Sequence, residues 1–352
     1  MEGVPVVPDP TALYRIRDSA YATDLLVAAV AELDLFSLLA GIGPTTASEL
    51  CGELGLAARP ADVLLTLCAA RGLVDRDLAS GDLIRVTDLA RAHLTAGSPY
   101  DLRAYYRSLA ERPGVQELVR VLRTDRPAAW ASSTAGGAVT ADRRDWSGRL
   151  VDPDFAGRIT AAMDARGAFL GPALADTLAD LPCTGLLDIG GSSGVYAAAL
   201  IEKRATARAA VVERPPVDAA ARSLLEARGL AGRIEVIGAD MFSDPLPAGY
   251  DLHLYSQVLH DWDRERVAQL LAASFEALPP GGWLVDHDTH IDADKSGPLP
   301  VAEYSVLLMH STPGKCWSVG ELSEMTAAAG FVDARVLPTV ADRSAFLVRK
   351  PG

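Results

Sequence analysis

The stretch Leu186-Leu187-Asp188-Ile189-Gly190-Gly191-Ser192-Ser193-Gly194 decides the fold of this chain of 352 residues. Its apolar first half is typical of a buried strand, its glycines of a tight turn, and residues 195–204 of the helix that follows. Alternating strands and helices continue to the C-terminus, which predicts right-handed crossovers and a mainly parallel sheet. We therefore predict a Rossmann-like, doubly wound α/β domain over residues 181–352. Its strands are expected at 185–188, 209–213, 234–237, 250–255 and 282–286, with a closing hairpin at 334–339 and 344–348.

The glycine turn also indicates a ligand, because glycine lets the backbone bend sharply and approach a bound molecule closely. Dinucleotide-binding turns read G-x-G-x-x-G and hold a pyrophosphate at the helix N-terminus. Here the pattern is D-x-G-x-x-x-G. The leading carboxylate, Asp188, would repel a pyrophosphate but suits the positively charged methionine end of S-adenosylmethionine.

Two later strand ends support the same ligand. Glu213 ends the second strand, where it is placed to bind both ribose hydroxyls, and Asp240-Met241 follows the third strand, where it offers a carboxylate and an apolar surface to adenine. A purely structural turn would explain the glycines but not all three elements in register. We predict a methyltransferase whose S-adenosylmethionine site is formed by Asp188, Gly190, Gly191, Gly194, Glu213, Asp240 and Met241.

The first hundred residues predict a helical module with a small hairpin. Residues 14–39 show helical spacing, Thr46 and Glu49 stand at capping-box spacing, and β-like runs follow a helix at 60–70. This winged-helix pattern raises the alternative of a DNA-binding regulator, but the candidate recognition helix offers only Arg59 and Arg71 as cations. We predict a dimerisation domain over residues 1–100, and a helical linker or lid over 101–180.

Composition narrows the class further. The formal net charge of −13 argues against nucleic acid as a partner. The longest apolar stretch, 22–36, is interrupted by acidic residues, so we expect no membrane segment. The four cysteines are scattered and form no CxxC pair, which is typical of reduced thiols. A cytoplasmic location is the expectation.

A second constellation, Tyr255-Ser256-Gln257-Val258-Leu259-His260-Asp261-Trp262-Asp263, follows the fourth strand. Side chains at the carboxyl ends of such strands face the ligand crevice, which makes His260 the candidate catalytic histidine. Together with the glycine turn and the helical N-terminal third, Leu259-His260-Asp261-Trp262 resembles the caffeate-type O-methyltransferase family over nearly the whole chain. The resemblance implies a class I methyltransferase fold, an interlocked homodimer, and a histidine near the acceptor that removes a phenolic proton.

The sequence departs from that family at the positions that support the histidine. Gln257 occupies a position that is usually basic, Cys316 replaces an orienting carboxylate, and a new histidine, His310, precedes it, while Asp288 is a surviving candidate for the other orienting acid. These departures are similar to those of metal-dependent α-keto acid C-methyltransferases. That resemblance implies iron or zinc held by Gln257, His260 and His310, and a substrate that chelates the metal.

The leading hypothesis is therefore metal-assisted methylation at the β-carbon of an amino-acid-derived 2-oxo acid, in natural-product (antibiotic) biosynthesis. A divalent metal would act as a Lewis acid on the keto oxygen, with Asp261 or a metal-bound water taking the proton. Arg149 is favoured over Arg143 and Arg144 to pair with the substrate carboxylate.

The alternative is a metal-independent O-methyltransferase of a phenolic natural product, with His260 as general base and His310 as a hydrogen-bonded core residue. A competing histidine pair, His287 and His290, would point to opposite faces of an extended segment and is expected to be solvated or at an edge.

Overall fold

The structure is a computed structural model that describes residues 7–127 and 146–352. Its C-terminal domain is built on a seven-stranded sheet with the order β6-β5-β4-β7-β8-β10-β9. The strands are parallel except β10, which runs antiparallel to β8 and β9. They are β4 (Gly185–Ile189), β5 (Arg208–Glu213), β6 (Ile234–Gly238), β7 (Leu252–Ser256), β8 (Trp283–Asp288), β9 (Val332–Pro338) and β10 (Ser344–Arg349).

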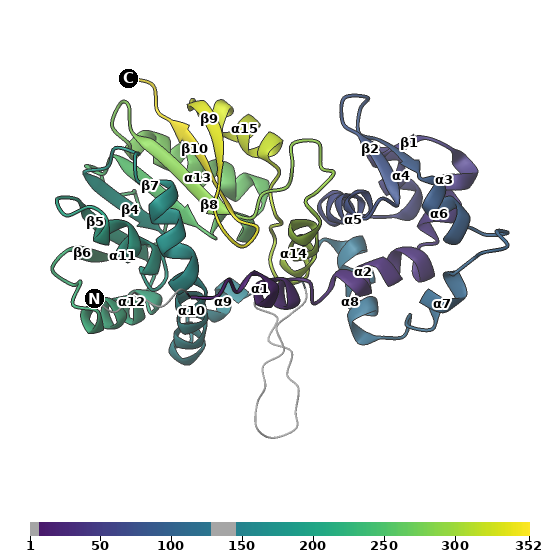
Figure 1. The fold of residues 1–352 in the computed structure, drawn as a ribbon, viewed down its shortest axis with the longest axis horizontal. Coiled ribbons are helices and arrows are strands. Elements are labelled where there is room, and N and C mark those ends of the chain that lie inside the picture. The colour runs from purple at the N-terminus through teal and green to yellow at the C-terminus, as the bar shows by residue number, and fades with distance from the viewer. Residues whose placement is uncertain (1–6, 128–145) are drawn as a thin grey trace.

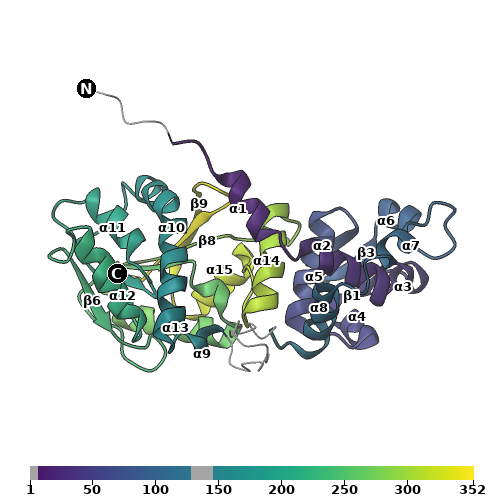
Figure 2. The same cartoon turned by 90° about the horizontal axis from the view of Figure 1, so that it is seen from below.

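Helices cover both faces of this sheet (Figures 1 and 2). Leu186 of β4 belongs to a core with α10 (Pro153–Thr177), α11 (Val195–Glu202) and α12 (Val217–Ala227). The next residue, Leu187, belongs to the opposite core with α13 (Arg264–Ala277) and α15 (Val319–Ala328). Successive side chains of a strand point to opposite faces, so a strand buried on both sides must be apolar throughout. The predicted doubly wound α/β fold is confirmed.

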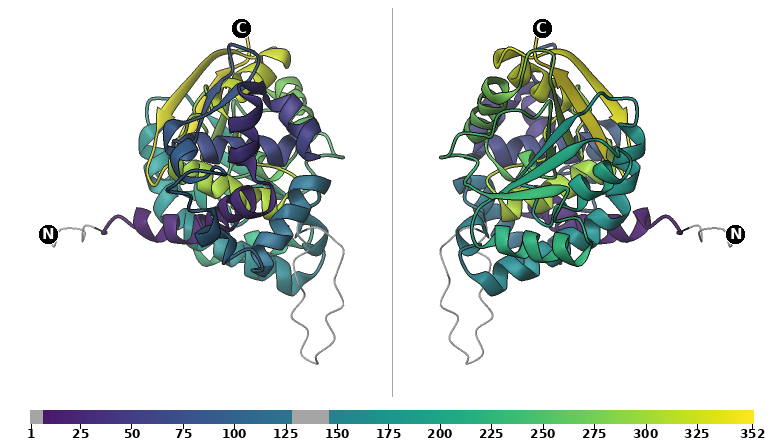
Figure 3. Two further views of the ribbon diagram at one scale, coloured as in Figure 1. Left: turned by 90° about the vertical axis from the view of Figure 1, so that its right-hand side faces the viewer. Right: turned by 90° about the vertical axis from the view of Figure 1, so that its left-hand side faces the viewer.

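From β4 the chain adds β5 and β6 on one side of the sheet and then returns to add β7 and β8 on the other side. This change of direction between β4 and β7 places a crevice at the carboxyl ends of these two strands. The turn at 190–194 follows β4, and the short 3₁₀ helix η2 (Leu259–Asp261) follows β7. Both predicted constellations therefore start from the same edge of the sheet. β9 and β10, yellow at the top of both views in Figure 3, close its far end.

The N-terminal domain is helical with a small antiparallel sheet of order β1-β3-β2. The capping box of Thr46 and Glu49 is present at the start of α4. The elements are α1 (Thr11–Asp18), α2 (Ala22–Val27), the π-helical η1 (Ala28–Glu32), α3 (Leu35–Ile42), β1 (Thr45–Thr46), α4 (Ala47–Leu54), α5 (Ala58–Ala70), β2 (Val74–Asp77), β3 (Leu83–Val86), α6 (Asp88–His93), α7 (Arg103–Arg107) and α8 (Pro113–Thr124).

The helical spacing over residues 14–39 belongs to several helices. The chain is divided into α1, α2, η1 and α3, and Asp34 before α3 has a left-handed φ of 46°. An Asp residue can adopt a left-handed conformation, but this conformation interrupts a right-handed α-helix. No single described helix is long and apolar enough to cross a bilayer, although the bent pair Ala22–Glu32 and Leu35–Ile42 passes that test by length and composition.

Helix α14 (Leu299–Ser311) joins the two domains (Figure 1). Residues of α14 such as Val301, Val306 and Met309 are fully buried in the same hydrophobic core as α2, α5 and α8. The N-terminal helices therefore pack directly on α14, an element of the C-terminal domain. The short α9 (Trp146–Arg149) and the long α10 lie below the sheet in Figure 1.

A buried ionic network reinforces this junction. The carboxylate of Asp62 on α5 lies 2.6 Å from the guanidinium of Arg76 and 2.8 Å from the ammonium of Lys295, and it also contacts Lys315. The same two lysines bind Glu321 at 3.1 and 2.6 Å. Burial disfavours the charged form of Asp62, but the three cations outweigh that cost and hold its pKa well below the usual value.

We expect Asp62→Ala to lower the free energy of unfolding by about 3–5 kcal/mol, because it leaves three neighbouring cations without their shared counter-ion. Urea denaturation followed by tryptophan fluorescence measures this change. Asp75→Ala removes an exposed carboxylate from the adjoining β2 and should stay within about 0.5 kcal/mol of the parent chain. Equal, small effects of the two substitutions would show that the network does not hold the domains together.

Candidate active site

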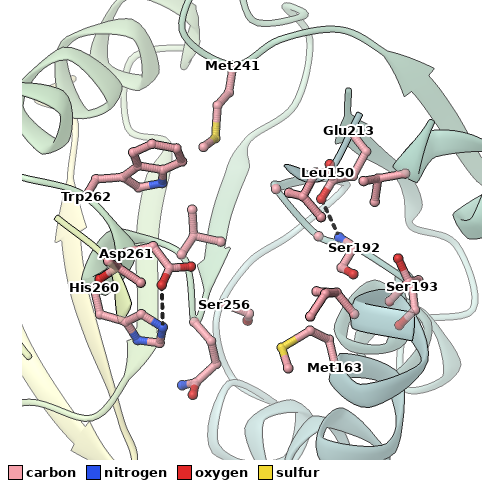
Figure 4. A pocket seen from close by; sticks show the side chains of 18 of the residues that line it. Leu150, Met163, Ser192, Ser193, Glu213, Met241, Ser256, His260, Asp261 and Trp262 are labelled. Carbon is pink, nitrogen blue, oxygen red and sulfur yellow. Dashed lines mark hydrogen bonds and ion pairs between the residues drawn. The ribbon is translucent and has the colours of Figure 1, made fainter. Parts of the chain in front are cut away.

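A large cavity opens at the switch point between β4 and β7 (Figure 4). Its empty volume is about 1410 Å³ with the open mouth included. Figure 4 shows His260, Asp261 and Trp262 facing Ser192 and Met163 across it. The wall combines the glycine turn, the ends of β5, β6 and β7, and one face each of α10 and α14.

The glycine turn has the backbone that its sequence predicts. Gly190 and Gly194 have left-handed φ angles of 68° and 71°. A Cβ at Gly191 would lie only 2.5 Å from Cγ of Asp188. Asp188 is fully buried beneath the turn and is not among the cavity-lining residues, so it supports the turn from behind instead of facing the cavity directly. Burial raises the pKa of Asp188 to about 7.

The other predicted donor-site residues, Glu213, Asp240 and Met241, all line the cavity. Glu213 accepts hydrogen bonds from the backbone amides of Ser192 at 2.9 Å and Arg214 at 3.1 Å. Burial raises its pKa to about 7. Asp240 accepts from the Phe242 amide at 2.9 Å, which fixes the turn that carries Met241. The structure thus brings the three elements of the predicted donor site to one wall.

His260 is held on the opposite side of the cavity by a short hydrogen bond. Its Nδ1 donates to Oδ1 of Asp288 at 2.6 Å, and its Nε2 lies 3.6 Å from Oδ1 of Asp261. His260 and Asp288 are 3% and 2% exposed. Burial disfavours the imidazolium, but the carboxylates of Asp288 and Asp261 outweigh it and raise the pKa of His260. Burial raises the pKa of Asp261 to about 6.

Two contacts fix the backbone of η2, which carries His260, and a third holds the side chain of the residue that follows it. The indole of Trp317 donates to the carbonyl oxygen of Leu259 at 3.0 Å. Gly314 packs so closely on the carbonyl oxygen of His260 that a Cβ at this position would overlap it. The ring of Trp262 meets Phe242 edge-on, with centroids 4.6 Å apart, on the cavity side. The imidazole is therefore positioned by packing as well as by Asp288.

The structure gives no support to the predicted metal site, because His310 is not among the residues that line the cavity. Its ring stacks on Tyr21 with centroids 4.0 Å apart, and its Nε2 lies 2.9 Å from Glu117. Gln257 does line the cavity, but its side-chain amide donates to the carbonyl oxygen of His287 at 3.0 Å. His310 thus packs against the N-terminal helices, and neither these contacts nor any group of described residues supports iron or zinc held by Gln257, His260 and His310.

The histidines near the end of β8 also differ from expectation. His287 and His290 are buried, at 0% and 7% exposure, and not solvated. His290 lies 3.1 Å from Asp286 and 2.7 Å from Ser344, whereas His287 lies 3.3 Å from Thr339. They bind different partners on the sheet, so they do not form a joint ligand pair. Cys316, which replaces the expected carboxylate, is buried with its sulfur 3.1 Å from Thr289.

Arg149 is not among the described arginines that line the cavity, which are Arg17, Arg166 and Arg214. It lies over the ring of Phe155, 4.2 Å from its centroid. Arg143 and Arg144 lie outside the described residues. Thr160, Met163 and Arg166 line the cavity from α10, and this three-residue spacing along one helix face is the signal that could have identified Arg166.

Comparison with known proteins matches both domains. The model of an O-methyltransferase domain covers residues 118–332, and that of an O-methyltransferase dimerisation domain covers residues 16–96. A 3-hydroxy-5-methyl-1-naphthoate 3-O-methyltransferase from Streptomyces sahachiroi is 30% identical, over 95% of this chain and 92% of its own length. An L-tyrosine C(3)-methyltransferase from Streptomyces lavendulae is 28% identical, over 86% and 82% of the two chains. A solved structure of an O-methyltransferase family 2 protein from Planctomyces limnophilus DSM 3776 in complex with apigenin is 32% identical, with a TM-score of 0.84 and coverage of 97% and 96%.

We expect Gly191→Ala to weaken S-adenosylmethionine binding about tenfold, because the added Cβ meets the Asp188 carboxylate and displaces the turn. Isothermal titration calorimetry measures the dissociation constant. Gly232→Ala, which has open space around its Cβ, serves as the control and should bind like the parent chain. An unchanged affinity of Gly191→Ala would mean that the donor does not bind at this turn.

Proposed function

Because the chain belongs to the S-adenosylmethionine-dependent O-methyltransferase family that carries a dimerisation domain, we propose that it methylates a hydroxyl group of an aromatic natural product as a homodimer. The observation that carries this proposal is the buried His260–Asp288 pair at the cavity wall. The relative that methylates a hydroxynaphthoate and the solved structure with bound apigenin support an aromatic acceptor.

The donor half of the site follows from the residues around the glycine turn. S-adenosylmethionine supplies an electrophilic methyl group on a positively charged sulfur. Glu213 would accept hydrogen bonds from the ribose hydroxyls, and Met241 would pack on the adenine with Asp240 beside it. Without side chains at Gly190 and Gly191, the turn leaves room for the methionine part of the donor. The positive charge of the bound donor would favour the ionised form of Asp188 beneath the turn, whose pKa burial raises to about 7.

His260 would act as the general base. The hydrogen bond from Nδ1 to Asp288 leaves the lone pair of Nε2 as the proton acceptor. A phenolic hydroxyl ionises near pH 10, and the raised pKa of His260 narrows the gap to that value. The acceptor O–H gives its proton to Nε2 as its oxygen forms the new bond to the methyl carbon, and the carbon–sulfur bond breaks with its electron pair leaving on sulfur.

The carboxylates beside His260 would stabilise the imidazolium that forms when its ring accepts the proton. Asp288 and Asp261 both favour the imidazolium electrostatically. Such pre-arranged charges cost no reorganisation at the moment of reaction. No observation on the described part of the chain favours metal-assisted C-methylation of a 2-oxo acid, since His310 belongs to the N-terminal core.

His260→Gln should lower kcat about 10²- to 10⁴-fold, because it removes the proton acceptor while keeping a polar side chain. Formation of S-adenosylhomocysteine from a panel of hydroxyaryl acceptors measures the loss, and calorimetry should show an unchanged affinity for S-adenosylmethionine. His93→Gln on α6, outside the cavity, serves as the matched control. Full activity of His260→Gln would refute the general-base role.

The pH profile of kcat/KM gives a second readout of the same prediction. His260 must be neutral to act as a base, so activity should fall on the acid side with a midpoint above the ordinary histidine value of about 6.5. Asp288→Asn removes the charge that favours the imidazolium, so the midpoint should move to lower pH. A midpoint that stays in place in Asp288→Asn would contradict the pairing.

A further inference from the structure

Arg166 on α10 has an unusual position for a cation. It lines the cavity, and its Nε is shielded from solvent without a hydrogen-bond partner among the described residues. Its Nη1 makes one long contact of 3.5 Å with the hydroxyl of Tyr304. The described carboxylates form no ion pair with it, although an arginine in a protein always carries its charge. A guanidinium with a shielded, unbonded N–H and no counter-ion is costly unless a ligand completes its environment.

The carboxylates nearest to Arg166 are engaged elsewhere. Asp18 and Asp288 both act on the Arg166 guanidinium electrostatically. Asp18, however, binds Arg343 at 2.8 Å and Arg17 at 3.2 Å, and Asp288 binds His260 at 2.6 Å. Among the described residues, therefore, no carboxylate forms an ion pair with Arg166.

A second donor without a partner lies within electrostatic range of Arg166. Tyr196 on α11 also lines the cavity and is 4% exposed, and its hydroxyl has no hydrogen-bond partner among the described residues. Burial raises the pKa of Tyr196 to about 12, so this hydroxyl keeps its proton at neutral pH. Arg166 and Tyr196 thus both line the cavity, and within the described ranges neither Nε of Arg166 nor the hydroxyl of Tyr196 has a hydrogen-bond acceptor.

We propose that Arg166, assisted by Tyr196, binds a carboxylate of the acceptor, so that the substrates are aromatic hydroxy acids. This inference rests on the proposed function for the identity of the reacting hydroxyl. A planar carboxylate matches the guanidinium fork, which can donate two parallel hydrogen bonds to it. A doubly charged phosphate would suit the cavity less, because Glu213 and Asp261 also line it.

The position of Tyr304 relates the two ends of such a substrate. Its ring meets His260 edge-on with centroids 5.6 Å apart, and its hydroxyl contacts Arg166. Arg166, the proposed carboxylate site, therefore lies at the hydroxyl end of the Tyr304 side chain, and His260, the proposed base, lies beside its ring. A substrate that reaches both carries its hydroxyl and its carboxylate on different edges of the aromatic system, with the ring system along Tyr304 and Leu308.

The other two described arginines that line the cavity, Arg17 and Arg214, lie in different surroundings. Arg17 binds Asp18, and 59% of its side chain is exposed. Arg214 follows Glu213 at the donor end. Arg166 instead contacts the hydroxyl of Tyr304, whose ring meets that of His260, and this places Arg166 at the acceptor end of the cavity.

The test compares a matched pair of probes, 6-hydroxy-2-naphthoate and its neutral carboxamide, by calorimetry in the presence of S-adenosylhomocysteine and by methyl transfer. The parent enzyme should bind the acid about tenfold or more tightly than the amide. Arg166→Gln should remove this preference and raise the KM of the acid by about the same factor, with the KM of S-adenosylmethionine unchanged. Arg166→Lys should retain part of it. Arg158→Gln removes an exposed charge from the same helix, outside the cavity, and should retain all of it.

Three outcomes would overturn the inference: no preference of the parent enzyme for the acid, an equal loss for acid and amide in Arg166→Gln, or a raised KM for S-adenosylmethionine alone, which would assign Arg166 to the donor carboxylate. If Arg166→Gln does not fold, as judged by thermal melting, Tyr196→Phe replaces it and should weaken binding of the acid several-fold and spare the amide. A retained preference for the acid without methylation of either probe's hydroxyl would instead count against the proposed O-methylation.

Discussion

The buried hydrogen bond from Nδ1 of His260 to Oδ1 of Asp288 is the interaction on which the site depends. It exists because β7 and β8 are neighbouring parallel strands, so the segment after Ser256 and the last residue of β8 meet at one edge of the sheet. The register of the sheet therefore positions the base. Outside water, such a charge-assisted bond fixes both the orientation of the ring and the nitrogen that carries its proton.

Helix α14 connects this centre to the rest of the molecule. One face of the helix presents Tyr304 and Leu308 to the cavity, and the other buries Met309 and His310 among N-terminal helices. The N-terminal domain thus stabilises a wall of the active site in addition to carrying the dimerisation sequence. The Asp62 network acts on the same junction, because Lys315 lies just after α14. Folding of the N-terminal domain and geometry of the acceptor site are consequently linked.

Much of the catalytic domain could be predicted from local pattern. Apolar strands, the glycine turn and the carboxyl-end rule were sufficient to place Glu213, Met241 and His260 at one crevice, because each depends on sheet topology alone. His310 could not be placed this way. Each residue of a helix turns by about 100°, and only packing decides which face meets a partner, so the change from cavity to core between Leu308 and His310 is invisible in the sequence. The sequence does not single out Arg166, because the helical pattern before residue 180 does not show which face of α10 meets the cavity.

The protonation state of His260 tests the account most directly. Nitrogen-15 NMR of the enzyme, with the resonances assigned by comparison with His260→Gln, reports which ring nitrogen carries the proton and the pH at which the second one binds. The account predicts a neutral ring protonated on Nδ1 in alkaline solution and a pKa above about 6.5. A ring protonated on Nε2, or a pKa below the ordinary histidine value, would contradict it.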